Sequence, residues 1–350
     1  MTFLQAVILH CLHKVNSERT IYSIFHLLTG KKSSQTIQDG HLYDMLTFFK
    51  VLPRLKRQQY DLLIEQLKKQ QYIHFPESNL HAVVSNQGQE AYIAFFQKHP
   101  FPTFIHGWKF QDASIQMWKR LTLLIQAISH FNYSSTRYYP IQRDPDTATW
   151  VKQYILRHKN ISQLKEQLYN ELFYIFSNDF PEEPNFIIER FSGYEKIGLT
   201  GSQIAEKYTI NEIEAYFRYL NCLHYIVEKV ASHKDQFSVL FSLIQDVFKQ
   251  VPFTQSTLYT YNLLNQNYSI DEIARIRQLK VSTIEDHIIE IAYADPHFSI
   301  TPFIDEHLVK RVSEAANKLG IKKLKPIKEC VKESSYFQIR LVLARAGVKR

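Results

Sequence analysis

The stretch SIDEIARIRQLKVSTIEDH, residues 269–287, decides the fold of the C-terminal part of the chain. Ser269 followed by Glu272, and Ser282 followed by Glu285, are capping-box patterns, in which a hydroxyl and a carboxyl side chain pair with the backbone at a helix start. The two patterns predict two helices whose starts lie close together in the sequence. A short helix, a tight turn and a second helix make a helix-turn-helix unit.

The apolar residues of this stretch fit the same interpretation. Ala274 allows the two helices to cross closely, because a larger side chain would push them apart. Leu279 and Val281 are expected to anchor the turn. The other residues expected to face inward are Ile273, Ile284, Ile288 and Ile291.

A similar pattern occurs earlier in the chain. The stretch SQIAEKYTINEIEAY, residues 202–216, carries Ile204 and Ala205 where the later stretch carries Ile273 and Ala274. This weak internal repeat predicts a second helix-turn-helix-like unit near residues 198–228, with the longer helix running to about Glu228.

Acidic residues follow the start of the second helix in both units. Glu285, Asp286 and Glu290 are expected on the outward face of the later unit, and Glu212 and Glu214 on that of the earlier one. Carboxylates in a major groove are repelled by the two phosphate chains beside it. We therefore expect both units to serve as scaffolds or protein-docking surfaces.

Positive charge is concentrated at the C-terminal end. Of the net charge of +8, residues 308–350 contribute twelve Lys or Arg against three Glu, so the rest of the chain is nearly neutral. Pro326 suits a helix start, with Ile327, Cys330 and Val331 on one side and a lysine ridge of Lys325, Lys328 and Lys332 on the other. A buried Cys330 and a last helix over residues 335–347 are expected.

A lysine ridge of this kind can hold DNA phosphates without reading sequence, although a merely solvated charged face has the same composition. The predicted DNA-binding residues are Lys322, Lys323, Lys325, Lys328, Lys332, Arg340 and Arg345.

The whole chain is predicted to be a mainly α, multi-domain helical protein. Residues 1–103 have the winged-helix-like order of helix, helix, helix and hairpin, in which one helix ends before Gly30, the third helix covers residues 55–71, and strands at 72–75 and 80–84 flank a turn at 76–79. Residues 104–250 form a helical middle domain whose aromatic and aliphatic stripes serve packing. Residues 251–350 form the basic helix-turn-helix domain.

The sequence lacks the residues that nucleotide-binding, disulfide-forming and metal-binding sites require. Glycine is scarce, at 9 residues, and Gly30-Lys31-Lys32-Ser33 lacks the rest of a phosphate-binding loop, so we interpret it as a helix end and a solvated turn. The three cysteines form no paired motif, and His10 and His13 lack a third metal ligand. We expect no enzyme activity, cofactor, metal or membrane span, and a cytoplasmic, nucleoid-associated location.

Residues 256–347 resemble the helicase-associated helix-turn-helix domain at the C-terminus of many bacterial RecQ-type helicases. The matching pieces are TLYT (257–260), SIDEIARIR (269–277), STIEDH (282–287), LKPIKE (324–329) and YFQIRLVLA (336–344). The whole chain is similar to the YpbB family of Firmicutes, stand-alone carriers of this domain associated with a RecQ-like helicase. The supporting upstream pieces are WKRLTLLIQ (118–126), WVK (150–152) and GLTGSQIA (198–205).

The resemblance implies an accessory protein of a RecQ-type DNA helicase in DNA repair and recombination, docking on the motor protein and binding DNA independently of sequence. It supplies no catalytic residues and no marked partner surface. The alternative is a helix-turn-helix transcription regulator, for which Thr283 and His287 are the available base-reading groups.

Overall fold

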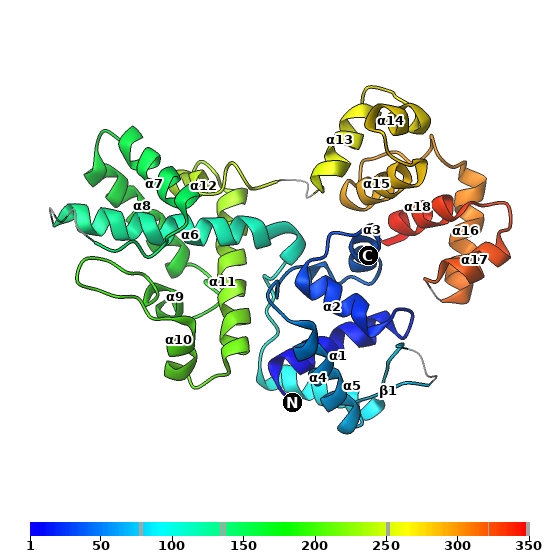
Figure 1. Cartoon of the computed structure of the whole chain (residues 1–350), viewed down its shortest axis with the longest axis horizontal. Coiled ribbons are helices and arrows are strands. Elements are labelled where there is room, and N and C mark those ends of the chain that lie inside the picture. The colour runs from blue at the N-terminus through cyan, green and yellow to red at the C-terminus, as the bar shows by residue number, and fades with distance from the viewer. Residues whose placement is uncertain (77–79, 134, 136–137, 250–252, 321, 348–350) are drawn as a thin grey trace. The chain divides into compact units, whose positions relative to one another are not determined.

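The computed structural model describes residues 1–76, 80–133, 135, 138–249, 253–320 and 322–347. Within these residues the chain forms eighteen α-helices, one 3₁₀ helix and a single two-stranded sheet, so the prediction of a mainly α protein is confirmed (Figure 1). The chain divides into two compact units. Unit 1 contains Met1–Leu4 and Phe95–Phe248, and unit 2 contains Gln5–Ala94 and Lys249–Arg350.

Unit 1 contains the helices that run from turquoise through green to yellow-green in Figure 1. They are α6 (Gly107–Asn132), α7 (Pro145–Arg157), α8 (Ile161–Ser177), α9 (Asn185–Ile188), α10 (Gly201–Lys207), α11 (Glu212–Ser232) and α12 (Ser238–Ser242).

Unit 2 joins the two ends of the chain. Its N-terminal half contains α1 (Phe3–Val15), α2 (Ile21–Thr29), α3 (Ser34–Leu42), the 3₁₀ helix η1 (Leu46–Phe48), α4 (Arg57–Lys69), β1 (Ile73–His74), β2 (Val83–Val84) and α5 (Asn86–Lys98), of which α1 and α5 extend into unit 1. Its C-terminal half contains α13 (Gln255–Leu264), α14 (Ile270–Arg277), α15 (Val281–Ala294), α16 (Glu306–Leu319), α17 (Leu324–Cys330) and α18 (Tyr336–Gly347).

The long helices α6 and α11 pack against each other in the core of unit 1, and α7 packs on α6. Leu121 and Ile128 of α6 and Leu164 and Leu168 of α8 are buried, which confirms that these predicted stripes serve packing. Arg120 connects α6 to the last residues of unit 1, because its guanidinium donates two hydrogen bonds to the Asp246 carboxylate at 2.6 and 2.7 Å.

The N-terminal half of unit 2 places four α-helices, α1 to α4, before the hairpin, one more than the predicted winged-helix-like order of three helices. Gly30 ends α2 in the left-handed conformation, with φ of 77°, and Ser33 caps α3, so the Gly-Lys-Lys-Ser segment is a helix end and a turn as expected. The strands pair antiparallel, Ile73 opposite Val84 and His74 opposite Val83. Of the predicted turn at 76–79, residues 77–79 lie outside the described residues.

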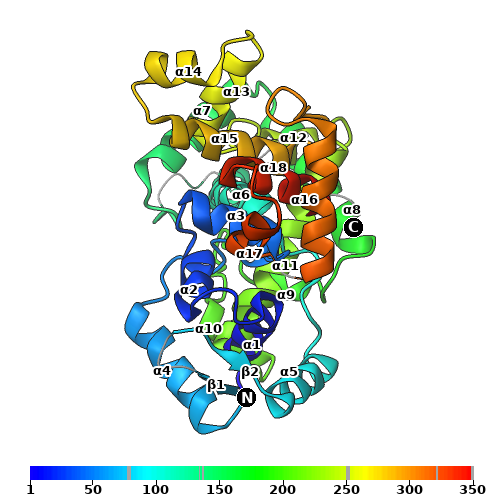
Figure 2. The same cartoon turned by 90° about the vertical axis from the view of Figure 1, so that its right-hand side faces the viewer.

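The structure combines the three predicted segments into two units. The expected boundaries after residues 103 and 250 lie near positions 94 and 248, where the chain passes between units. The first and third segments form one unit, because α3 packs on both α15 and α18 (Figure 2). The C-terminal helices are therefore joined to the N-terminal segment, a pairing that no local pattern indicates.

None of the helices in the described part of the chain combines the length and the apolar content that a bilayer crossing requires.

The core of unit 1 contains one fully buried histidine, which gives a test of this packing. His224 of α11 accepts a hydrogen bond at Nδ1 from the backbone N–H of His106 at 3.0 Å, and its Nε2 lies 3.2 Å from Gln111 Oε1. These two contacts favour the neutral form of the imidazole ring, with the proton on Nε2. Burial, with a smaller contribution from His106, lowers the pKa of His224 to about 3.

We expect unit 1 to lose stability in acid for this reason. A histidine in the unfolded chain has a pKa of about 6.5, so between that pH and about 3 the unfolded state binds the extra proton. The contribution is fully present above pH 6.5 and is lost as the pH falls, by roughly 3–5 kcal/mol. His224→Asn should flatten the acid side of the pH profile of the free energy of unfolding. The same change at the exposed His233 should leave the profile as it is.

Candidate nucleic-acid interface

Helices α14 and α15 form the predicted helix-turn-helix unit. Ser269 and Glu272 make the expected capping box at the start of α14, and Gln278 turns the chain in the left-handed conformation with φ of 51°. Ala274 is buried between the helices, together with Ile273, Ile284, Ile288 and Ile291. The core of the unit is therefore as the sequence predicts.

Two details at the start of α15 differ from expectation. The helix begins at Val281, after Lys280, with no side-chain cap, so the predicted capping box of Ser282 and Glu285 is wrong. Ser282 lies inside the first turn instead. Val281 is 43% exposed and does not anchor the turn. Of the two residues predicted for this role, Leu279 packs against the core.

The earlier unit is also present, in unit 1. Thr200 and Gln203 form a capping box at the start of α10, and α11 follows after a short turn. Ile204 and Ala205 are buried, as their counterparts Ile273 and Ala274 are. The weak repeat therefore corresponds to the same local geometry used twice.

Glu290 is not on an outward face, and this expectation was wrong. It is only 5% exposed and accepts hydrogen bonds from the Thr254 backbone N–H at 2.6 Å and from the Thr257 hydroxyl at 2.6 Å. Burial raises the pKa of the Glu290 carboxyl, although these hydrogen bonds oppose the shift. The carboxylate satisfies groups that the start of α13 would otherwise leave unpaired.

The other predicted outward acids are mostly engaged as well. Asp286 forms an ion pair with Arg340 of α18, and Glu285 is half-buried. In the earlier unit Glu214 is buried, with its carboxylate 3.1 Å from His99 Nδ1, and only Glu212 is exposed. The predicted row of repelling carboxylates is therefore absent from α15 as the structure describes it.

Helix α15 is nevertheless unsuited to lie along a major groove. It packs against α13, α14, α18 and α3, and every residue from His287 to Ala292 is buried (Figure 2). The accessible groups are at its start: Lys280, Val281, Ser282 and, in part, Thr283. His287, expected as a possible base-reading group, instead bonds the Thr260 hydroxyl through Nδ1 at 2.9 Å.

Four of the seven predicted DNA-binding residues contact protein groups. Lys328 donates hydrogen bonds to the backbone carbonyls of Lys332 and Ser334, and Arg345 donates to that of Pro296 at 2.7 Å. Lys328 therefore binds carbonyl groups just beyond the end of its own helix, α17, and Arg345 binds one just beyond the end of α15.

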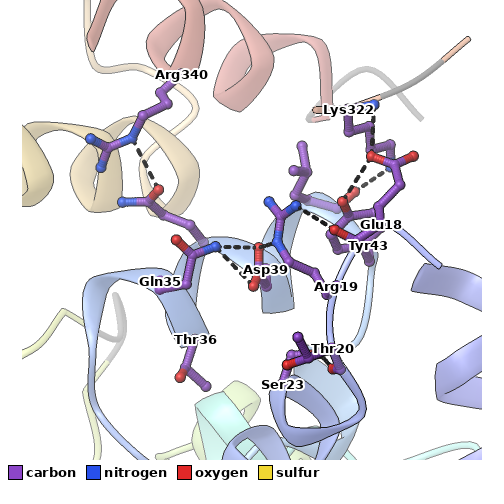
Figure 3. Close-up of polar contacts among 12 residues, drawn as sticks. Glu18, Arg19, Thr20, Ser23, Gln35, Thr36, Asp39, Tyr43, Lys322 and Arg340 are labelled. Carbon is purple, nitrogen blue, oxygen red and sulfur yellow. Dashed lines mark hydrogen bonds and ion pairs between the residues drawn. The ribbon is translucent and has the colours of Figure 1, made fainter. Parts of the chain in front are cut away.

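Lys322 and Arg340 reach the N-terminal half of unit 2. The Lys322 backbone N–H donates to the Glu18 carboxylate at 3.1 Å, and its ammonium group bonds the Leu42 carbonyl. Arg340 donates through Nε to Gln38 Oε1 at 3.1 Å. Figure 3 shows Lys322 beside Glu18 and Tyr43, and Arg340 above the α3 residues.

The remaining three, Lys323, Lys325 and Lys332, are exposed. The expected ridge of Lys325, Lys328 and Lys332 does not lie along one helix, because α17 ends at Cys330 and Lys332 follows it. Cys330 is exposed, so the prediction that it is buried was wrong.

Sequence reasoning missed two groups of residues around these cations. Lys310 and Lys318 of α16 are exposed in the same basic stretch, and charge alone could have included them. Glu18 and Gln38 bind residues about 300 positions away. No signal in a single sequence marks contacts of that range.

Comparison with known proteins agrees with this architecture. Residues 256–343 match the family described as "Helix-turn-helix domain". Over 347 residues the chain is 31% identical to "Protein YpbB" of Bacillus subtilis (strain 168). The aligned region covers 99% of this chain and 98% of that protein. The chain belongs to the YpbB family. No solved structure matches it.

The YpbB family resemblance inferred from the sequence is thereby confirmed, and the matched helix-turn-helix domain supports DNA binding. The relative's name states no activity or partner.

The buried carboxylate of α15 gives a stability test. Glu290→Ala removes the acceptor of the Thr254 N–H and the Thr257 hydroxyl, and we expect the free energy of unfolding to fall by about 2–4 kcal/mol. Glu285→Ala, in the same helix but half-buried, should cost no more than about 1 kcal/mol. Urea unfolding of the full chain measures both. Equal losses would contradict the capping role of Glu290.

Proposed function

We propose that this member of the YpbB family is a non-enzymatic DNA-binding protein that holds DNA by its phosphates and serves as an accessory factor of a RecQ-type helicase in repair and recombination. The DNA-binding part depends chiefly on one observation. The basic residues 308–350 keep Lys323, Lys325 and Lys332 exposed, and the exposed Lys310 and Lys318 extend the same charge.

Sequence-independent binding is supported by the burial of α15. A helix that reads bases places its side chains against base edges in the major groove. Here residues 287–292 of α15 are buried by other helices, and the fully exposed residues of the helix lie in its first turn. Lysines, in contrast, bind phosphate as point charges without regard to the bases.

The helicase part of the proposal is supported by sequence alone. Residues 256–347 resemble the domain that many RecQ-type helicases carry at their own C-terminus, and 256–343 match a helix-turn-helix family. A domain that is elsewhere fused to the motor is a natural accessory when it occurs on a separate chain.

The alternative, a transcription regulator, depends on the accessible first turn of α15. Lys280, Ser282 and Thr283 offer hydrogen-bond donors there. Competition between random duplexes and the promoter of the protein's own gene separates the two functions. Equal affinity is expected for phosphate binding, and a preference of a hundredfold or more would favour the regulator.

The lysines can be tested by the salt dependence of DNA binding. Changing Lys323, Lys325 and Lys332 to Ala should weaken binding to every duplex by about tenfold or more and flatten the log–log salt slope by roughly 2–3. The matched control changes three exposed lysines of unit 1, Lys152, Lys159 and Lys196, to Ala. An unaltered slope in the first variant would refute the assignment.

The helicase role can be tested with the purified proteins. We expect the full chain to co-purify with a RecQ-type helicase from the same cells and to change the rate at which that helicase unwinds duplex DNA. The triple lysine variant should still co-purify if the helicase binds outside these three lysines, and loss of co-purification would show that the helicase binds the same surface as DNA. No co-purification and no effect on unwinding would reject the accessory role while leaving DNA binding intact.

A further inference from the structure

The contact between α3 and the C-terminal helices of unit 2 has a composition unlike that of a hydrophobic core. We call this contact the α3 seam. On the N-terminal side it consists of Glu18, Gln38, His41, Leu42 and Tyr43, and on the C-terminal side of Asp286, Tyr293, Lys322 and Arg340.

The cationic groups of the seam are held by oxygen atoms and aromatic rings. The Lys322 ammonium group lies 5.3 Å from the centre of the Tyr43 ring and bonds the Leu42 carbonyl, while its backbone N–H bonds the Glu18 carboxylate (Figure 3). Tyr43 in turn donates its hydroxyl to Glu18 at 3.1 Å. The N-terminal segment therefore supplies an acceptor to the Lys322 backbone N–H, and an acceptor and an aromatic ring to its ammonium group.

Arg340 is held from both sides of the seam. Its Nε donates to Gln38 Oε1 on α3, and its Nη2 donates to Asp286 on α15. Beside this bridge the ring of His41 stacks on Tyr293, with the ring centres 4.6 Å apart and 14° between the planes. Among the residues that the structure describes, Gln38 is the hydrogen-bond partner of the Arg340 guanidinium in the N-terminal segment.

The seam is loosely filled. A cavity of about 260 Å³ lies along it, and its lining includes the polar side chains of Arg19, Ser34, Gln35, Asp39 and Asp286. Adhesion between protein surfaces comes mainly from buried apolar area, and polar groups exchange protein partners for water at little net cost. Leu42 packs against the apolar core of the C-terminal helices, whereas the other contacts named above are polar or aromatic, so opening the seam exchanges mainly polar contacts for water.

Lys322 and Arg340 are also two of the residues predicted to bind DNA. The Leu42 carbonyl and the Gln38 amide oxygen accept hydrogen bonds from their cationic groups here, and the Glu18 carboxylate accepts one from the Lys322 backbone N–H; phosphate oxygens are acceptors of the same kind. We propose that the α3 seam is an intramolecular latch, in which residues 18–43 occupy cationic groups that DNA phosphates bind when the seam opens. This inference rests on the proposed DNA binding, because DNA is the competing ligand.

A variant that weakens only the N-terminal side of the seam tests the competition. Glu18→Ala with Gln38→Ala removes two acceptors and leaves every cation in place. We expect DNA binding to become about three- to tenfold tighter, and the log–log salt slope to steepen by about 1–2 as Lys322 and Arg340 join the phosphate contacts.

The matched control is Glu65→Ala with Gln58→Ala, the same two residue types on the exposed face of α4. It changes the net charge equally, so the affinity gained by the seam variant beyond the control measures the latch. Circular dichroism and thermal unfolding of both variants establish that the full chain remains folded.

Hydrogen–deuterium exchange of the α3 amides, residues 34–42, gives a readout that does not require DNA. Exchange should be faster in the seam variant than in the control, and adding duplex DNA should accelerate it in the unmodified chain. If the chain binds DNA but neither affinity nor α3 exchange responds, the latch is overturned and the proposed function stands. If neither the unmodified chain nor the seam variant binds DNA, the proposed function fails and the competition fails with it.

Discussion

The enclosure of α15 is the constraint on which the C-terminal half of unit 2 depends. Ile284, Ile288, Ile289 and Ile291 are fully buried, and α13, α14, α18 and α3 each pack on this helix. Apolar burial of this extent fixes the helix in place, because removing one such side chain leaves a cavity that costs several kcal/mol. A helix enclosed in this way belongs to the core of its domain. Contacts with a ligand are therefore left to the residues at its ends and to the neighbouring helices.

This enclosure explains how the charges are used. The buried part of α15 contains Glu290, which is tolerable only because Thr254 and Thr257 supply hydrogen bonds to the carboxylate. Asp286, nearer the surface, is balanced by Arg340. The acids are thus directed toward protein groups, and Lys323, Lys325 and Lys332 are left on the surface. The excess positive charge of residues 308–350 thus includes exposed lysines, which supports a polyanion as ligand.

The arrangement of unit 2 also links the two ends of the chain. Residues 5–94 and 249–350 share one unit, although 154 residues of sequence separate them. Their contact through α3 is polar and includes cationic groups of the basic segment. The N-terminal segment therefore influences which cations are available, and a protein of this architecture can couple its N-terminal half to the binding behaviour of its C-terminal half.

The sequence by itself determined the local structure. Ser269 with Glu272, Ala274 and the spaced isoleucines identified the helix-turn-helix unit, because caps and helical periodicity act over a few residues. It also located the excess charge. Which charged groups face solvent depends on the tertiary structure. Glu290 is buried, and Lys322 and Arg340 form hydrogen bonds with protein groups. Their partners come from other parts of the chain, up to 304 positions away. Contacts at that range depend on how the helices pack.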